Sequence, residues 1–407
     1  MQADSAPPGH HVLAGGRVVT PEGVLDPGWI QLNGSLIHAV GPGEAPQQAG
    51  VPVAELRGRW VLPGFVDMHV HGGGGFSFTE GTGTDARRAA EFHRAHGTTT
   101  IVASLVTAPV AELEARAAML AGLAGAGVIA GIHSEGPFLS AARCGAQDPR
   151  HMIEPDVTVF ERLLAAAAGH LKVMTIAPEL PGAAEVIKTA VRAGVIAAVG
   201  HTDASADVTL AAVDAGATHA THLFNGMRPL HHREPGPVGA LLVRDEVTCE
   251  VIADGVHLSD TTIRLAARAA GTGRLVLITD AMAAAGMADG SYELGSMGVT
   301  VAGGVARLAG DGAGNSAGNS AADRPGAIAG STATMADVVR HAVAAGLTVP
   351  AVAAAASTSP ARVLGLANRT GALRVGLDAD LVVCDEDFRL CATMRRGEWV
   401  GQQPVSG

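Results

Sequence analysis

The sequence predicts an α/β protein made of a (β/α)8, TIM-like barrel and a small β-sandwich domain formed by the N- and C-terminal segments. Eight apolar runs of strand length lie in the middle of the chain, and stretches with helical spacing separate most of them. Residues 1–60 and the stretch from about residue 371 instead contain short β-like runs between glycines and prolines. Continuous apolar runs are typical of parallel strands buried on both faces, and their alternation with helices favours a closed barrel.

The barrel strands are expected where the chain is continuously apolar. They occupy residues 61–70, 98–106, 127–133, 171–178, 194–201, 217–224, 247–255 and 274–281. Helices are expected in the intervening stretches with apolar residues at helical spacing, such as 84–97, 109–127 and 260–271. The predicted domains are therefore a small β domain, residues 1–60 with 371–407, and a barrel, residues 61–370.

Two segments depart from this alternation. The crossover after Phe224 is rich in Pro, Gly and His, which predicts a functional loop rather than a regular helix. Residues 310–327 repeat GNSA and lack apolar periodicity, which predicts a flexible surface loop without a chemical role.

The composition indicates a globular protein, because 47% of the 407 residues are hydrophobic and 16% are charged. The net charge of −11 disfavours nucleic acid or an anionic membrane as a partner, so an anionic substrate needs a local cluster of positive groups. No apolar run reaches about 18 residues and the N-terminus lacks a secretory pattern, so a cytoplasmic protein is expected. The four scattered cysteines include no C-x-x-C pair, which fits a reducing compartment.

The stretch FVDMHVHGGGG, residues 65–75, contains two histidines at alternate positions at the end of the first predicted strand. Alternate residues of a strand point to the same face, so His69 and His71 project together and can share a metal ion. The alternative is a pair of unrelated polar residues in a surface loop. Asp67 lies on the same strand face and can orient one of the imidazoles.

Residues of metal-ligand type also end other predicted strands, namely Glu135, His201, His222 and Asp280. The carboxyl ends of the strands of a (β/α)8 barrel face one mouth, where active sites are built. Unpaired carboxylates and imidazoles are costly to bury, so their collection there needs a reason. Together with the H-x-H pair they predict a centre for one or two divalent ions. Zinc is the expected ion, with iron, manganese or cobalt as alternatives.

Other histidines near these strand ends have simpler interpretations. His133 obeys the same strand alternation as the third-strand carboxylate, so it is either a further ligand or a buried residue behind the ligands. By strand parity, His219 points to the opposite face from His222 and is left out of the centre. His231 and His232 lie in the irregular loop and are expected to be solvated.

Seven motifs occur along the chain in the order PGFVDMHVHG, GIHSEGPFLS, GHTDA, THLFNGM, REPG, ADGVH and TDAM. Together they resemble the amidohydrolase superfamily and, within it, the N-acetylglucosamine-6-phosphate deacetylase family. The C-terminal GALRVGLDADLVV resembles the small β domain of the superfamily. The H-x-H motif alone is general to the superfamily, whereas HSEGPF with THLFN and REPG is specific to the deacetylases.

The resemblance implies which residues bind metal. Glu135, His201 and His222 match the ligands of the ion that is present throughout the family. His69 and His71 match a pair that only some members have, and this pair implies a second ion with Glu135 as the bridging ligand.

The resemblance also implies catalytic and substrate-binding residues. Asp280 matches the catalytic acid/base, which also contacts metal. The matching substrate-binding residues are Asn225, Gly226, Arg233 and His257. In the family Arg233 reaches the site of the neighbouring subunit, which implies a homodimer.

The loop after GPFLS departs from the family pattern. Members usually carry a histidine there, near K-G-x-H, whereas this chain reads ARCGAQDP with Cys144 and Gln147. Substrate contacts from this loop therefore differ, and Cys144 is either a substrate contact or a free thiol.

The activity that the resemblance implies is hydrolysis of N-acetylglucosamine 6-phosphate to glucosamine 6-phosphate and acetate. Asp280 would move the proton from water to the leaving nitrogen, and His257 or His133 would help to stabilise the oxyanion. The alternative enzyme is an amidohydrolase for a different acyl or cyclic amide. Such enzymes typically use a carboxylated lysine on the fourth strand, but here Lys172 lies at the wrong end of that strand. A non-catalytic metal-binding scaffold is the other alternative, although it would have no use for a proton shuttle.

Overall fold

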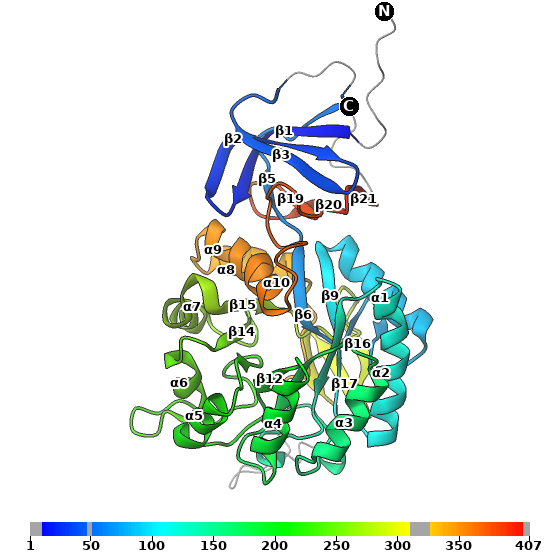
Figure 1. Cartoon of the computed structure of the whole chain (residues 1–407), viewed down its shortest axis with the longest axis vertical. Helices are drawn as coiled ribbons and strands as arrows, with labels where there is room; N and C mark the ends of the chain where they lie inside the picture. Colours follow the sequence, from blue (N-terminus) through cyan, green and yellow to red (C-terminus); the bar gives the residue numbers. More distant parts are fainter. Residues whose placement is uncertain (1–9, 47–50, 310–325, 402–407) are drawn as a thin grey trace, which may run out of the picture. The chain divides into compact units, whose positions relative to one another are not determined.

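The structure, a computed structural model, describes residues 10–46, 51–309 and 326–401. All eight predicted barrel strands are present in one parallel sheet, in which neighbouring strands follow the order of the chain (Figure 1). They are β6 (Phe65–Val70), β9 (Thr98–Leu105), β10 (Gly131–Glu135), β11 (Leu171–Ile176), β12 (Ile196–Val199), β13 (His219–Ala220), β14 (Thr248–Ile252) and β15 (Leu275–Ile278). A bridge between Val70 and Ala281 joins the end of β6 to the chain after β15, so the sheet nearly closes at its carboxyl end.

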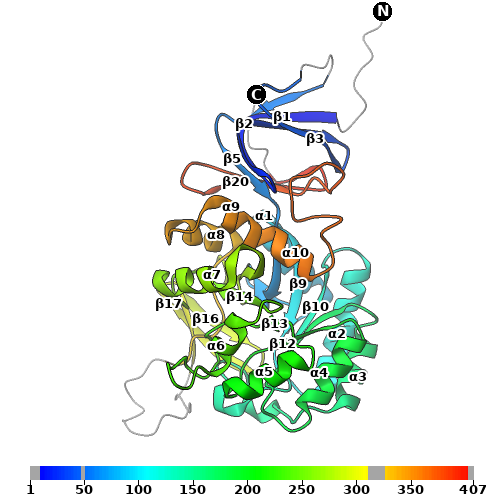
Figure 2. The same cartoon turned by 60° about the vertical axis from the view of Figure 1, so that its left-hand side comes forward.

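Helices alternate with these strands, as predicted, and Figure 2 shows α2 to α7 on the outside of the strands. The helices are α1 (Gly83–Ala95), α2 (Val110–Gly125), α3 (Val157–Ala166), α4 (Ala183–Arg192), α5 (Ala206–Asp214), α6 (Gly236–Val243) and α7 (Asp260–Arg274). Side chains of Asp156, Ser205 and Ser259 accept backbone N–H groups in the first turns of α3, α5 and α7, which satisfies donors that a helix leaves unpaired. The crossover after Phe224 is irregular up to Pro235, as predicted.

The first and third predicted strands differ from the observed ones. The run 61–70 divides at Gly64 into β5 (Trp60–Pro63), which belongs to another sheet, and β6. A Cβ atom on Gly64 would lie 2.4 Å from Oγ1 of Thr99, so only glycine fits at this junction. The third strand begins at Gly131, later than predicted, because the preceding apolar residues belong to the turn after α2.

The two ends of the chain form a second eight-stranded sheet, as predicted from their β-like runs. Its strands are β5 with β1 (His10–Thr20), β2 (Gly23–Asn33), β3 (Leu36–Pro42), β4 (Val53–Glu55), β19 (Leu381–Cys384), β20 (Leu390–Arg395) and β21 (Glu398–Val400). Strands from both ends contribute to one apolar core, which includes Leu13, Ile30 and Leu381.

The chain divides into two compact units. One contains Met1–Asp67, His93–Thr100 and Met335–Gly407, and the other contains Met68–Phe92 and Ile101–Thr334. The first unit includes α8 (Met335–Ala344), α9 (Val349–Ala353) and α10 (Ser359–Val363) beside the terminal strands. The domain boundaries at residues 60 and 371 stay predictions.

Small antiparallel sheets follow two of the barrel strands and were not predicted. After β15 come β16 (Gly290–Leu294), β17 (Met297–Ala302) and β18 (Val305–Leu308), whose apolar residues pack with Val106 and Met282. After β6 comes the short pair β7 (Gly72–Gly73) and β8 (Phe76–Ser77). Most of the predicted loop 310–327 lies outside the described residues. Among the residues described, no helix combines the length and apolar character needed to cross a membrane.

Candidate metal centre

The predicted ligands lie at the carboxyl ends of the barrel strands. His201, His222 and Asp280 each follow a strand by two residues, and their φ angles are 44°, 27° and 50°. Positive φ is uncommon for residues other than glycine, and such backbone strain concentrates at functional sites. The turn that ends each of these strands therefore holds an imidazole or a carboxylate at the barrel mouth, where Glu135 ends β10.

The first cluster of donor atoms contains His69, His71, Glu135 and Asp280, all of them buried. Nε2 of His71 lies 3.2 Å from Oε2 of Glu135 and 3.2 Å from Oδ1 of Asp280. Nε2 of His69 lies 3.5 Å and 3.4 Å from these two oxygens and 3.2 Å from Nε2 of His71. The predicted H-x-H pair therefore meets a carboxylate from each of two other strands.

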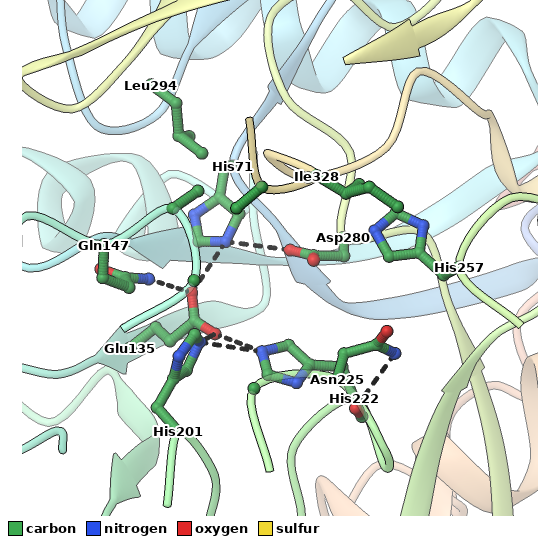
Figure 3. Close-up of a pocket in the computed structure, with 15 residues that line it drawn as sticks. His71, Glu135, Gln147, His201, His222, Asn225, His257, Asp280, Leu294 and Ile328 are labelled. Atoms are coloured by element: carbon green, nitrogen blue, oxygen red, sulfur yellow. Dashed lines mark hydrogen bonds and ion pairs between the residues drawn. The ribbon is translucent and has the colours of Figure 1, made fainter. Parts of the chain in front are cut away.

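The second cluster contains Glu135, His201 and His222, and it shares the carboxylate of Glu135 with the first (Figure 3). Oε1 of Glu135 lies 3.1 Å from Nε2 of His201 and 2.8 Å from Nε2 of His222. Because Oε1 faces this cluster and Oε2 faces the other, Glu135 has the geometry of a bridging ligand.

The spacing of these atoms fits a bound cation. Around a tetrahedral zinc ion with bonds of about 2.0–2.1 Å, neighbouring ligand atoms lie about 3.3 Å apart. The two Nε2 atoms of His69 and His71 are 3.2 Å apart, and those of His201 and His222 are 3.1 Å apart. Imidazole nitrogens and carboxylate oxygens are also the donors that divalent transition metals prefer. Both clusters therefore fit the ions that the sequence predicts.

Hydrogen bonds to the Nδ1 atoms of the imidazoles determine which ring nitrogen faces the cluster. Nδ1 of His71 donates to the carbonyl of Ser104 over 3.2 Å, and Nδ1 of His201 donates to the carbonyl of Arg143 over 2.9 Å. The lone pair of each ring is then on Nε2, which faces the cluster.

Glu250 supports the centre from β14 and is absent from the predicted set. Its Oε2 accepts from Nδ1 of His69 over 3.0 Å and from the backbone N–H of His222 over 3.0 Å, and its Oε1 accepts from Nε2 of His219 over 2.9 Å. One buried carboxylate therefore orients two of the predicted ligands, His69 and His222, from different strands. The signal available in the sequence is a glutamate inside a continuously apolar strand, where an unpaired charge would be costly.

The residues that the sequence set aside or left open occupy other positions. His133 uses both ring nitrogens on the hydroxyls of Ser104 (3.0 Å) and Thr175 (2.8 Å), so it belongs to neither cluster. His231 and His232 are exposed, and Lys172 lies near the start of β11. Asp67 and His219 are fully buried, and the orienting role of Asp67 stays a prediction.

The charges in the centre pair with one another. Burial lowers the pKa of His71, but the carboxylates of Asp280 and Glu135 outweigh it and raise this pKa to about 9. Burial raises the pKa of Glu135, but the imidazoles of His69, His201 and His222 hold it well below its ordinary value. Without an ion the imidazole of His71 is therefore protonated at neutral pH, and an incoming metal ion must displace this proton.

A pocket of about 240 Å³ adjoins both clusters. Asn225, Gly226 and His257 line it, and their substrate contacts stay predictions. Arg233 and Cys144 are not among its lining residues. Arg233 is exposed, with Nη1 2.7 Å from Nε2 of His232, and Cys144 is a half-buried free thiol. Their substrate contacts stay predictions.

The loop residue Gln147 also lines the pocket, and its side chain donates to Oε2 of Glu135. The sequence singled it out only as a departure from a family pattern, because a loop has no periodicity from which a contact can be predicted. Apolar side chains complete the wall, namely Ala146, Leu294, Ala327 and Ile328.

A barrel that collects imidazoles and carboxylates at one mouth is typical of metal-dependent hydrolases. The Amidohydrolase family model matches residues 60–400, and the chain belongs to this family. This confirms the resemblance that its motifs indicate.

Individual members of the family are similar to this chain over nearly its whole length. The N-acetylglucosamine-6-phosphate deacetylase of Bacillus subtilis (strain 168) is 35% identical over 390 residues, which cover 93% of this chain and 94% of that one. The N-acetylgalactosamine-6-phosphate deacetylase of Escherichia coli O157:H7 is 35% identical over 386 residues, covering 93% and 96%. The crystal structure of N-acetyl-D-glucosamine-6-phosphate deacetylase from Mycobacterium smegmatis superimposes with a TM-score of 0.87 at 46% identity, covering 96% of this chain and 100% of that one.

Proposed function

We propose that this chain hydrolyses the N-acetyl group of N-acetylglucosamine 6-phosphate in a metal-dependent reaction that gives glucosamine 6-phosphate and acetate. The observation that carries this proposal is the meeting of two ligand clusters and the carboxylate of Asp280 at one pocket. Relatives that are 35% and 46% identical over nearly the whole chain are named for this reaction, which supports the choice of substrate.

Asp280 provides the proton transfer that amide hydrolysis needs. The two clusters would hold a divalent ion, and when bound it would polarise the acetyl carbonyl and lower the pKa of water toward about 7. Burial raises the pKa of Asp280, but the imidazoles of His69 and His71 outweigh it and hold this pKa below its ordinary value. The carboxylate is therefore ionised at neutral pH and accepts the proton of the attacking water. It then donates this proton to the nitrogen, which cannot leave as an amide anion.

The pocket offers different surfaces to the different parts of the substrate. His257 and Asn225 present polar groups to the sugar, and Nδ1 of His257 is held by the carboxylate of Asp254 over 2.7 Å. Leu294 and Ile328 present an apolar surface on which the acetyl methyl group can be buried.

Phosphate recognition involves a second subunit in this proposal. The net charge of −11 repels a phosphate at long range, so selectivity depends on local donors. Arg233 of the partner subunit is the proposed donor, because a guanidinium binds phosphate through two parallel hydrogen bonds and is always charged. Its exposure in the irregular loop after β13 leaves it accessible to another chain. The active unit is therefore a homodimer.

Zinc is the proposed ion, with two ions per chain. The ligand set contains nitrogen and oxygen donors without thiolates, which suits zinc and also iron, manganese or cobalt. The cytoplasm is the proposed compartment, because four free cysteines fit a reducing environment.

The test is acetate release from N-acetylglucosamine 6-phosphate, N-acetylgalactosamine 6-phosphate and unphosphorylated N-acetylglucosamine. The first should have the highest kcat/KM, and removal of the phosphate should lower kcat/KM about 10–150-fold for each lost charge-assisted contact. The Escherichia coli relative makes the galactosamine epimer the second candidate. Faster release from that epimer would reassign the substrate, and no release from either phosphorylated sugar by metal-loaded protein would contradict the proposal.

A further inference from the structure

Gln147 connects the shared carboxylate of the centre to the backbone of Thr107, just after β9. It lies in the loop between β10 and α3, and its side chain is only 5% exposed. Its Nε2 donates to Oε2 of Glu135 over 2.6 Å (Figure 3). Its Oε1 accepts the backbone N–H of Thr107 over 2.7 Å.

The chemistry of the two partners fixes the orientation of this amide. The backbone nitrogen of Thr107 can only donate, so the amide oxygen must face it. The amide nitrogen then necessarily faces the carboxylate of Glu135, which can only accept when ionised. A rotation of the amide by half a turn would leave both partners facing a group of the same kind, so the side chain has one satisfied orientation.

The loop that carries Gln147 is attached on both sides of this residue. On one side, the backbone carbonyl of Arg143 accepts a hydrogen bond from His201. The guanidinium of the same Arg143 pairs with Asp203 over 2.8 Å. On the other side, the buried carboxylate of Asp148 accepts from Oγ of Ser296, in the turn between β16 and β17, over 2.6 Å. Gln147 is therefore held in place by its surroundings and can hold Glu135 in turn.

We infer that Gln147 is a positioning residue that keeps Oε2 of Glu135 directed at the cluster of His69, His71 and Asp280. Oε1 is already fixed by the imidazoles of the other cluster, so the bond from Gln147 sets the remaining rotation of the carboxylate. This inference rests on the proposed two-ion centre and adds that Gln147 contributes more to the binding of one ion than to the binding of the other.

The test is the zinc affinity of Gln147→Met, measured by competition with a chromophoric chelator. Methionine has a similar length but makes neither hydrogen bond, so the ion of the His69 cluster should bind about 10–100-fold more weakly, as is typical when a group behind a ligand is lost. The affinity for the ion of the other cluster should fall several-fold less. A His71→Ala background removes one ligand of the first cluster and leaves Glu135, His201 and His222 of the other complete, so the remaining ion should show almost no effect of Gln147→Met.

Two further variants separate positioning from damage to the fold. Gln147→His retains one accepting and one donating nitrogen, so it should recover most of the affinity that Gln147→Met loses. Gln31→Met replaces a buried glutamine of the other compact unit and should leave both affinities unchanged. The inference would be overturned if Gln147→Met lowered the affinity for both ions equally or for neither. It would also be overturned if Gln147→His failed to recover affinity, or if the wild-type chain bound only one ion. Acetate release measured on the same wild-type protein tests the proposed activity separately.

Discussion

The neighbours of each ligand determine which atom that ligand presents to the centre. Glu250, the carbonyl of Ser104 and the carbonyl of Arg143 each accept from the Nδ1 of one imidazole, which leaves the Nε2 of that ring directed at a cluster. Three imidazoles therefore direct Nε2 toward the shared carboxylate of Glu135, which is the arrangement that a bound cation requires.

Asp280→Asn should remove the proton shuttle while keeping the size of the side chain. If only general acid–base catalysis is lost, kcat should fall by about 10²–10⁴-fold. Acetate release is the measurement, with metal content determined in parallel because Asp280 also belongs to a ligand cluster. A variant with full metal content and near-normal kcat would exclude this role.

Asp254→Asn should weaken the ion pair that holds His257 at the pocket. Burial lowers the pKa of His257, but the bond to Asp254 outweighs it and raises this pKa above 6.5, while the pKa of Asp254 is held below 3.8. A raised histidine pKa contributes stability that is complete below pH 6.5 and is lost as the pH rises through the folded value. The lowered aspartate pKa contributes stability that is lost as the pH falls below 3.8.

The cost of Asp254→Asn should therefore be greatest in the window between these two ordinary values and shrink at higher pH. Loss of a charge-assisted hydrogen bond should lower the free energy of unfolding by about 1.5–3 kcal/mol in this window. Asparagine still accepts the backbone N–H groups of Val256 and His257, so the turn is retained. Denaturant unfolding of the variant and wild type at about pH 5 and about pH 9 is the measurement. A difference that grows with pH would show that the sign is wrong.

The sequence allowed some residues of the site to be predicted and not others, for a physical reason. His201, His222 and Asp280 could be placed at the barrel mouth because each follows the carboxyl end of a buried strand. Glu250 lies inside such a strand. From the sequence alone, a glutamate there can mean either that it supports the site or that the segment is not a buried strand. Gln147 depends on the path of a loop, which no short-range pattern encodes.

At the scale of elements, the strand ends are shaped by tight packing as well as by the ligands. Gly200 lies between β12 and His201, and a Cβ atom there would approach Cγ2 of Thr175 and Cβ of Thr221 to 2.7 Å each. The absence of a side chain thus lets the chain turn between two neighbouring strands and direct His201 into the centre.

Gly200→Ala should therefore destabilise the barrel and displace His201. Overpacking of this kind costs about 1–3 kcal/mol, and the affinity for the ion of the His201 cluster should fall as well. Gly122→Ala is the matched control, because a Cβ there meets nothing within 4 Å on an exposed face of α2. The control should gain about 0.5–1 kcal/mol, and unfolding midpoints together with zinc titration provide the measurement. Equal behaviour of the two variants would contradict the packing argument.

The elements with the longest apolar runs were the most predictable. The eight barrel strands are buried at nearly every residue and belong to mostly apolar runs, whereas β16 to β18 form a small sheet with one solvated face. The sequence signal for these strands is an alternation of apolar with polar or small residues, as in MGVTVA followed by Gly303 and Gly304. That signal is weaker than a buried run, because half of the residues in such a strand are polar or small.

At the scale of the whole molecule, the proposal assigns one phosphate contact to a second chain. Arg233 is not among the residues lining the pocket of its own chain, and the described part of that lining contains no lysine or arginine. A pocket for a phosphorylated sugar in a chain of net charge −11 therefore benefits from a cation supplied from elsewhere.

Mixing Arg233→Ala chains with Asp280→Asn chains tests this arrangement. Neither homodimer contains an intact site, but a mixed dimer has one site with both wild-type residues. If subunits exchange freely, half of the dimers are mixed and activity should approach about one quarter of that of the wild type. Activity that stays at the level of the separate variants after exchange would place both residues in the site of one chain.

The most direct test of the central claim is acetate release from N-acetylglucosamine 6-phosphate by protein of known metal content. Chelator-stripped protein should be inactive, and activity should rise with zinc until about two ions are bound per chain. His71→Ala should reduce the bound zinc toward one ion per chain, because it removes a ligand of the first cluster. Undiminished acetate release by the stripped protein, or none by a chain that holds two zinc ions, would contradict the account.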